Sequence, residues 1–331
     1  MMVAWRLSLP FLAAEVLANT ALAAHPYPLG VSFGQRNITA AVIDDNGSPL
    51  LLANIAGTNA YRQMMRDSID YEGLQWESDG DWYFSNGSDP VQIPEPGNKL
   101  LMEAIFLENL VEIRQVATQK LGYALDMASI VYPRHLNDTA REIFQKVVIG
   151  NEPGLSTARQ LGDSYDGAFR AYDFHLGESD GLVGFVDYDD EYVDQAVGKI
   201  AKDRAIWGAN GCNLRFRGMA RQDGASRITD NDTERAQKIN ELGISLGDTI
   251  EVFANMQGTG PKGLILSGEG PQLDFKYLRE SIAAAVPDHA DKICDSIDPT
   301  FVGAVGAAKW AKFQVDHADT FFNEPAGHDE L

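Results

Sequence analysis

Three carboxylates stand close together near the middle of the sequence, at Asp187, Asp189 and Asp190. Oxygen ligands of this kind are those that Ca²⁺ prefers, so the segment could hold this cation. The same residues are also common in a polar turn between two strands, where water would solvate their charges. We favour the solvated turn and keep the calcium site as the alternative.

The remaining reactive side chains form no clear catalytic set. A triad of Ser267, His289 and an aspartate could be imagined, but scattered polar residues explain these side chains better. The two cysteines, Cys212 and Cys294, are too few for a disulfide framework or a cysteine-based zinc site. They could form one disulfide bond or remain as buried thiols.

The composition excludes several classes of function. The 331 residues include 27 Lys and Arg but 48 Asp and Glu, which gives a formal net charge of −21. Such an acidic chain is unsuited to binding the phosphates of nucleic acids or an anionic membrane surface. Its hydrophobic share of 44% beside 23% charged residues is ordinary for a folded protein with large cores.

The two ends of the sequence indicate a subcellular location. Arg6 precedes a mostly apolar stretch and a small-residue cleavage site, so residues 1–23 are predicted to be a secretory signal peptide. Residues 319–331 are predicted to be a flexible tail that presents a retrieval signal to its receptor. We therefore expect a protein of the endoplasmic-reticulum lumen with no membrane span. The retrieval signal consists of His328, Asp329, Glu330 and Leu331.

A lumenal protein would meet the N-glycosylation machinery. The sequence contains five Asn-x-Ser/Thr triplets, each of which is a candidate acceptor. Their asparagines are Asn37, Asn46, Asn86, Asn137 and Asn231.

The pattern of apolar residues predicts strands that alternate with helices, which is typical of an α/β fold. A hairpin at Asn46-Gly47 is expected between short strands. Helical spacing that begins at Asn98 places Leu100, Ala104, Leu107 and Val111 on one face. Further strands are expected at 128–132, 182–186 and 264–266, and further helices at 138–148, 232–257, from about 272, and at 299–313.

Five segments, in order along the chain, resemble the nucleotide-binding domain of the heat-shock protein 70 chaperones, which belong to the actin-like ATPase superfamily. The Asn-Glu-Pro segment at 151–153 and the Pro-x-x-x-Asn-Asp-x-x-Arg segment at 133–141 are the most specific. The similar segments are residues 29–37, a first phosphate loop; 130–141, a strand, turn and helix; 149–156; 264–271, an adenosine motif; and 298–308.

The resemblance implies a ribonuclease H-like architecture of two lobes, each a mixed sheet flanked by helices, with a cleft between them. Lobe I would comprise residues 24–177, with residues 298–318 packing back onto it, and lobe II residues 178–297. The family's peptide-binding domain would follow the last helix, and we expect it to be absent here.

The resemblance also assigns a first phosphate loop to Gly34, Gln35, Arg36 and Asn37. The aspartate with which the family organises Mg²⁺ is replaced by Ser32. Arg36 could still meet an anion, or the segment could be a plain hairpin turn.

The family's second phosphate loop aligns with the acidic segment that begins at Asp187. Its phosphate-binding glycines are replaced by Tyr188, Asp189 and Asp190, whose carboxylates would repel ATP. Glu152 matches a family carboxylate that holds the waters of the metal, although a structural role in a hinge is equally open.

The adenosine motif is better preserved. Gly268 and Gly270 could pass the backbone against a purine, with Glu269 near the ribose and Pro271 at the start of the next helix. The alternative is a close turn from strand to helix, which requires the same glycines.

We therefore expect a pseudo-ATPase that acts as a binding or regulatory module in protein-folding quality control, with lumenal chaperones or client proteins as partners. The first alternative is a chaperone-type ATPase that binds ATP or ADP with Mg²⁺ and hydrolyses it slowly. The second is an acidic Ca²⁺-binding lumenal protein.

Overall fold

The structure is a computed structural model of the chain. The expected signal peptide, the retrieval signal, Asp190 and two of the glycosylation triplets, at Asn86 and Asn231, lie outside the residues that it describes. The described residues are 28–68, 96–123, 127–152, 161–174, 181–189, 192–202, 212–223, 232–258 and 260–317.

The first half of the chain builds a five-stranded mixed sheet in the order β3-β2-β1-β4-β5. Strand β2 pairs antiparallel with β1 and β3, whereas β4 pairs parallel with β1 and with β5. The expected hairpin joins β2 to β3, and Gly47 takes a positive φ of 79° there. The strands are β1 (Leu29–Phe33), β2 (Asn37–Ile43), β3 (Pro49–Ala56), β4 (Met127–Tyr132) and β5 (Leu161–Asp163).

The second half builds another five-stranded mixed sheet, in the order β8-β7-β6-β9-β10. Strand β6 is central. On one side of it β7 and β8 form an antiparallel meander, and on the other side β9 and β10 run parallel to it. This is the order and direction of the first sheet, so the chain uses one topology twice. The strands are β6 (Gly181–Tyr188), β7 (Tyr192–Lys202), β8 (Cys212–Asp223), β9 (Pro261–Ser267) and β10 (Ile293–Cys294).

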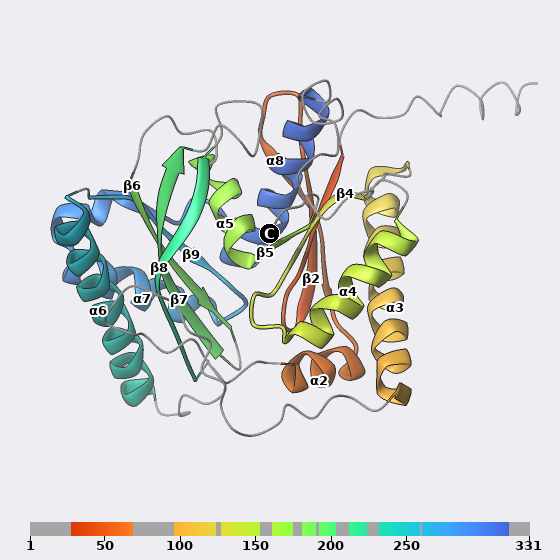
Figure 1. Cartoon of the computed structure of the whole chain (residues 1–331), viewed down its shortest axis with the longest axis horizontal. Helices are drawn as coiled ribbons and strands as arrows, with labels where there is room; N and C mark the ends of the chain where they lie inside the picture. The colour runs from red at the N-terminus through yellow and green to blue at the C-terminus, as the bar shows by residue number, and fades with distance from the viewer. Residues whose placement is uncertain are drawn as a thin grey trace, which may run out of the picture.

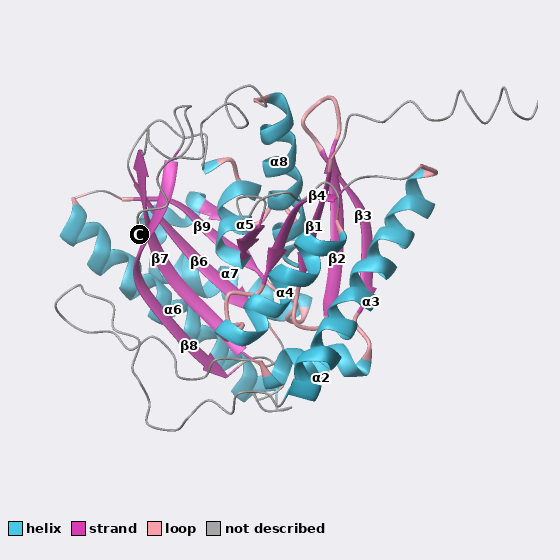
Figure 2. Cartoon of the chain, turned by 45° about the vertical axis from the view of Figure 1, so that its right-hand side comes forward, coloured by secondary structure: helices cyan, strands magenta, loops and turns pink. Residues whose placement is uncertain are grey.

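The helices form three layers around the two sheets (Figure 1). One set covers the outer face of the first sheet and another the outer face of the second, while two helices lie between the sheets (Figure 2). The expected α/β class, with two mixed sheets flanked by helices, is confirmed. The helices on the first sheet are α2 (Asn59–Asp67), α3 (Pro96–Leu121) and α4 (Asp138–Asn151). Those on the second sheet are α6 (Asp232–Gln257) and α7 (Gln272–Ala285). The two between the sheets are α5 (Ser164–Ala171) and α8 (Val302–Asp316).

The middle layer is held by small residues that allow close approach. A Cβ added to Gly306 of α8 would lie 1.8 Å from the carbonyl oxygen of Gly167 in α5. A Cβ added to Gly30 of β1 would lie 2.0 Å from the backbone nitrogen of Ala308. Helix α8 follows the second sheet along the chain and packs closely against β1 of the first sheet, so it returns the chain to the first sheet.

The predicted apolar face of α3 is real, but it is not the face that the core buries. Leu100 and Val111 are 69% and 45% exposed. The opposite side, which includes Phe106, Leu110 and Ile113, packs against the first sheet. The helix also begins at Pro96, before the expected Asn98. The predicted helix is confirmed, and it carries apolar residues on two faces, of which the core buries the one that the spacing did not single out.

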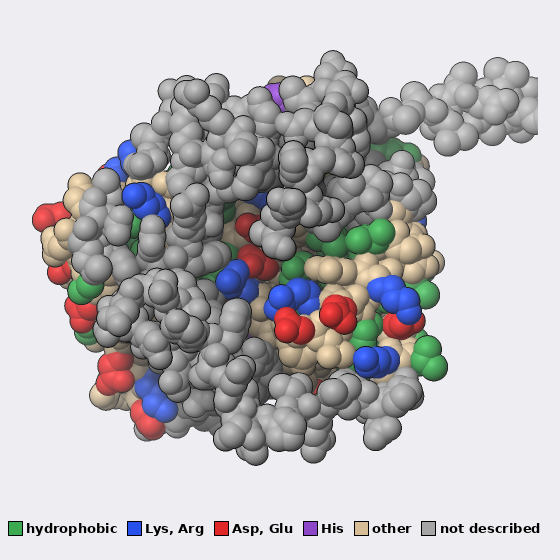
Figure 3. Space-filling view, in the orientation of Figure 1, with side chains coloured by type: hydrophobic (Ala, Val, Ile, Leu, Met, Phe, Trp, Pro, Cys, Tyr) green, Lys and Arg blue, Asp and Glu red, His purple; other side chains and the backbone are tan. Residues whose placement is uncertain are grey.

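Acidic and basic side chains are interspersed on the side of the molecule that α3 and α4 form (Figure 3). Among the described helices, none has both the length and the apolar character that crossing a bilayer requires.

Candidate functional site

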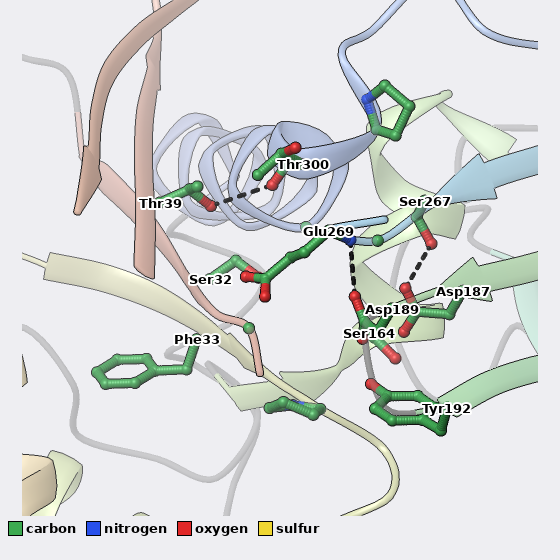
Figure 4. A pocket seen from close by; sticks show the side chains of 15 residues that line it. Ser32, Phe33, Thr39, Ser164, Asp187, Asp189, Tyr192, Ser267, Glu269 and Thr300 are labelled. Carbon is green, nitrogen blue, oxygen red and sulfur yellow. Dashed lines mark hydrogen bonds between the residues drawn. The ribbon is translucent and has the colours of Figure 1, made fainter. Parts of the chain in front are cut away.

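The first turn of each sheet faces a small cavity between the two sheets (Figure 4). Its walls come from the β1–β2 turn, the ends of β4 and β6, the β9–α7 turn and the start of α8. The cavity has a volume of about 40 Å³, which suits a few water molecules or one ion. It therefore brings together the two turns that the resemblance assigns to phosphate.

The β1–β2 turn offers backbone N–H groups to an anion. The N–H of Gly34 donates to the carbonyl of Asn37 at 2.8 Å and closes the turn, and the Tyr61 hydroxyl donates to the Gly34 carbonyl at 2.6 Å. The N–H groups of Arg36 and Asn37 are left to point outward from the turn. Successive donors in this arrangement form a small nest for negative charge.

The anion in this nest is the protein's own Glu269. Its carboxylate accepts from the N–H of Arg36 at 2.6 Å and from the N–H of Asn37 at 2.9 Å. A Cβ on Gly34 would lie 2.0 Å from Glu269 Oε1, so the missing side chain of Gly34 makes room for the carboxylate. We expected Glu269 near a ribose. It lies instead on the first phosphate loop, with Gln35 buried in the same turn.

The end of β6 and the β6–β7 turn contribute two buried carboxyl groups, Asp187 and Asp189, which are 5% and 3% exposed. Ser267 donates to Asp187 Oδ1 at 3.0 Å, and the backbone N–H of Glu269 donates to Asp189 Oδ1 at 2.7 Å (Figure 4). The expectation of a solvated turn was therefore wrong for these two residues. Ser267 at the end of β9 and Glu269 in the β9–α7 turn cover them.

Burial raises the pKa of all three carboxyl groups in the cavity. The pKa of Asp187 lies well above its usual range, and the charges of Asp189 and Asp194 raise it further. The pKa of Asp189 rises to about 7, with the charge of Glu269 as the second cause. The pKa of Glu269 also rises to about 7, although the N–H groups of Arg36 and Asn37 oppose the effect of burial. Each of these carboxyl groups therefore resists ionisation in the cavity, where a further negative charge would be poorly solvated.

The glycines of the expected adenosine motif serve the packing of the second sheet. A Cβ on Gly268, whose φ is +116°, would lie 2.4 Å from the Tyr188 carbonyl oxygen. A Cβ on Gly270 would lie 2.3 Å from the Tyr188 ring, and the Gly270 N–H donates to the Tyr188 carbonyl at 2.8 Å. Pro271 follows as the residue that precedes α7. This geometry favours the close strand-to-helix turn that was the alternative interpretation.

No protein-family model matches the sequence, and no curated protein matches it. The assignment of this site therefore rests on the described geometry and on the motifs.

Glu152 lies apart from the cavity. It ends α4, is 3% exposed, and pairs with Arg114 of α3 at 3.3 Å. It is not among the described residues that line the cavity. Its position therefore fits the structural alternative, in which it ties the end of α4 to α3.

The sequence Gly-Val-Ser-Phe-Gly at 30–34 has the Gly-x-Ser-x-Gly spacing of a nucleophilic serine, but it does not form the nucleophile elbow of that motif. Ser32 lies within β1, paired with Thr39 and Val131, rather than at a turn between strand and helix. A Cβ on Gly303 of α8 would lie 2.4 Å from its hydroxyl, so α8 covers it.

The imagined triad of Ser267 and His289 is also not formed. Ser267 ends β9, whereas the ring of His289 lies beside Gly260, just before that strand begins. Within the described residues, no group of three or more His, Cys, Asp or Glu side chains has a geometry that suits a metal ion. Cys294 is a free thiol.

Three of the glycosylation asparagines lie in the described residues. Asn46 is exposed in the β2–β3 turn. The Asn137 side chain accepts from the N–H of Ala140 and caps α4. Asn37 lies in the β1–β2 turn, where its N–H binds Glu269. Asn46 therefore offers the most accessible side chain of the three.

Proposed function

We propose that the chain is a pseudo-ATPase of the endoplasmic-reticulum lumen, built on the two-lobed architecture of the heat-shock protein 70 nucleotide-binding domain, which belongs to the actin-like ATPases. It acts without turnover, as a binding or regulatory module in protein-folding quality control, on lumenal chaperones or client proteins. The repeated sheet order, with a first turn of each sheet at a shared cavity, supports this architecture. The predicted signal peptide and the C-terminal retrieval motif support the location in the endoplasmic-reticulum lumen.

One observation carries the proposal of inactivity. The carboxyl groups of Asp187, Asp189 and Glu269 gather in the cavity where a triphosphate would need cations and N–H donors. No lysine or arginine belongs to the described lining of this cavity. A nucleotide phosphate would add negative charge to a site whose carboxyl groups already raise one another's pKa.

The test is binding and turnover of Mg-ATP by the full chain. We expect no rise in melting temperature at millimolar ATP or ADP with Mg²⁺, because only a ligand that binds the folded state stabilises it. We also expect phosphate release at the background rate. Hydrolysis above background that disappears in Asp187→Asn would overturn the proposal, since a contaminating ATPase would be unaffected by that variant.

The second candidate is a nucleotide-binding protein with slow hydrolysis. The observation that favours it is the pair of N–H donors from Arg36 and Asn37, which remain arranged for an anion. Nucleotide would have to displace Glu269 from them. A saturable melting-temperature rise with ATP, and none with adenosine, would favour this candidate over the pseudo-ATPase.

A further inference from the structure

The side chain of Glu269 crosses from one sheet to the other. Its backbone belongs to the turn after β9, in the second sheet, and its carboxylate lies on the turn after β1, in the first. The two hydrogen bonds join Glu269 to Arg36 and Asn37, which lie 233 and 232 positions earlier in the sequence. Carboxylate acceptors form the stronger class of hydrogen bond, so this contact is a substantial link between the two halves.

We propose that Glu269 is a tethered anion that locks the two halves of the molecule together by occupying an oxyanion site in the β1–β2 turn. The inference concerns regulation of the cavity and rests on the proposed function. The class of ligand that competes with the lock is a small oxyanion, such as a phosphate group. Its recognition would use the N–H groups of Arg36 and Asn37.

The turn that carries Glu269 is built to present it. Gly268 adopts a backbone conformation with φ of +116°, which side chains rarely allow, and packs against the Tyr188 backbone. Asp189 accepts the Glu269 N–H at 2.7 Å, and the Gly268 N–H donates to the Pro299 carbonyl at 3.2 Å. The backbone on both sides of Glu269 is thus fixed before its side chain reaches across.

The β1–β2 turn is equally well shaped to receive the Glu269 carboxylate. Gly34 leaves the space in which Glu269 Oε1 sits, and any larger residue would meet it. The Tyr61 hydroxyl fixes the Gly34 carbonyl at 2.6 Å, which orients the two donors that follow. A tethered carboxylate competes at an effective concentration of roughly millimolar or more, so a free oxyanion of ordinary affinity is excluded while the lock is closed.

The experiment removes the tethered anion and asks whether the turn is released. The variant is Glu269→Ala, and the matched control is Glu280→Ala, which removes a 57% exposed carboxylate from α7 in the same half. Hydrogen exchange of single amides is followed by NMR on the full chain. We expect the Arg36 and Asn37 amides to exchange at least about tenfold faster in Glu269→Ala, because they lose the carboxylate oxygens to which they donate.

The Gly34 amide serves as an internal control, because it binds the Asn37 carbonyl rather than Glu269. Inorganic phosphate is the ligand probe. It is expected to slow exchange of the Arg36 and Asn37 amides in Glu269→Ala and to leave the native chain unchanged. Should Glu269→Ala fail to fold, Glu269→Gln keeps one acceptor oxygen and is expected to release only one of the two amides.

Unchanged protection of both amides in Glu269→Ala, or in Glu269→Gln if that variant is needed, would overturn the lock. Equal phosphate binding by the native chain and by the variant would overturn it too. Either result leaves the pseudo-ATPase proposal standing, because that proposal depends on Mg-ATP binding by the native chain. Conversely, tight ATP binding by the native chain would refute the proposed function, whereas the lock is judged from the amide exchange of the ligand-free chains.

Discussion

The β1–β2 turn and the β6–β7 turn occupy the same place in two sheets of the same order, yet their chemistry is opposite. The first presents backbone N–H donors from Arg36 and Asn37, and the second, with the end of β6, presents the carboxyl groups of Asp189 and Asp187. A phosphate needs donors from both sides, and only one side supplies them. Glu269, held by Asp189 through its N–H, fills the donor side with a carboxylate.

The difference teaches that a shared topology fixes where a turn lies but not what it can bind. Both turns are closed by a backbone hydrogen bond, from Gly34 to Asn37 in one and from Asp189 to Tyr192 in the other. The groups that each turn presents, backbone N–H donors in the first and carboxyl groups in the second, then decide which charge it can bind. Four predictions test this contrast.

Replacing Gly268 by alanine is expected to have the largest effect. The new Cβ would meet the Tyr188 carbonyl at 2.4 Å in a strained backbone region, so the free energy of unfolding should fall by more than about 3 kcal/mol. Gly47→Ala is the control, since its φ is +79° but nothing lies within 4 Å, and it should cost about 1 kcal/mol. Urea unfolding measures both. Equal losses would show that the contact with Tyr188 contributes nothing.

Replacing Asp189 by asparagine should stabilise the protein at pH 8. Burial raises the pKa of Asp189 to about 7, so the charged form is disfavoured in the folded state. Asparagine keeps an acceptor for the Glu269 N–H without the charge. We expect the free energy of unfolding at pH 8 to rise by about 1–3 kcal/mol, with a smaller gain at pH 5. A loss of stability at pH 8 would mean that a cation neutralises this side chain.

The native chain should lose stability as the pH rises from about 4 to 7. The folded-state pKa values of Asp189 and Glu269 are raised to about 7, so the folded state holds more protons than the unfolded state in this window. The stability that this provides is complete at low pH and is lost as the pH passes 7. About 3 kcal/mol is expected from Asp189 between pH 4 and 7.

Urea unfolding at several pH values measures this dependence. The double variant Asp189→Asn with Glu269→Gln should flatten the curve, which separates these groups from the general repulsion of a chain with net charge −21. A native curve that rises between pH 4 and 7 would contradict the raised pKa values.

N-glycosylation at Asn46 and Asn37 should distinguish the two turns of the first sheet, with little change in the free energy of unfolding. When the chain is expressed in a secretory system, Asn46→Gln should reduce the mass by one N-glycan, because Asn46 is exposed in the β2–β3 turn. Asn37→Gln tests the β1–β2 turn, where a glycan would crowd the cavity, and should leave the mass of the purified folded protein unchanged. Loss of a glycan only in Asn37→Gln would contradict the closed cavity.

Much of the fold could be predicted from the sequence, because its strongest signals are local. Asn46-Gly47 marked its hairpin since the turn needs a positive φ, and the apolar run at 264–266 marked β9. Strand β7 was missed because its residues mix polar and apolar types without a clear alternation. Helix α5 was missed although its Asp163–Asp166 capping box is a recognisable start signal.

The candidate site was predicted only in part. The sequence singled out Gly34, Arg36, Asn37 and Glu269, and the structure brings them together. The contact between Glu269 and the first turn could not be predicted, since it joins residues more than 230 positions apart and depends on how the two sheets are placed. The burial of Asp187 was missed for the same reason, because Ser267, 80 positions later at the end of β9, covers it.

The central claim, that a nucleotide is rejected by carboxyl groups already buried in the cavity, is tested most directly by calorimetric titration of the native full chain with Mg-ATP at neutral pH. The account predicts no saturable heat up to millimolar nucleotide. A single-site isotherm with micromolar affinity, abolished in Asp187→Asn, would contradict it.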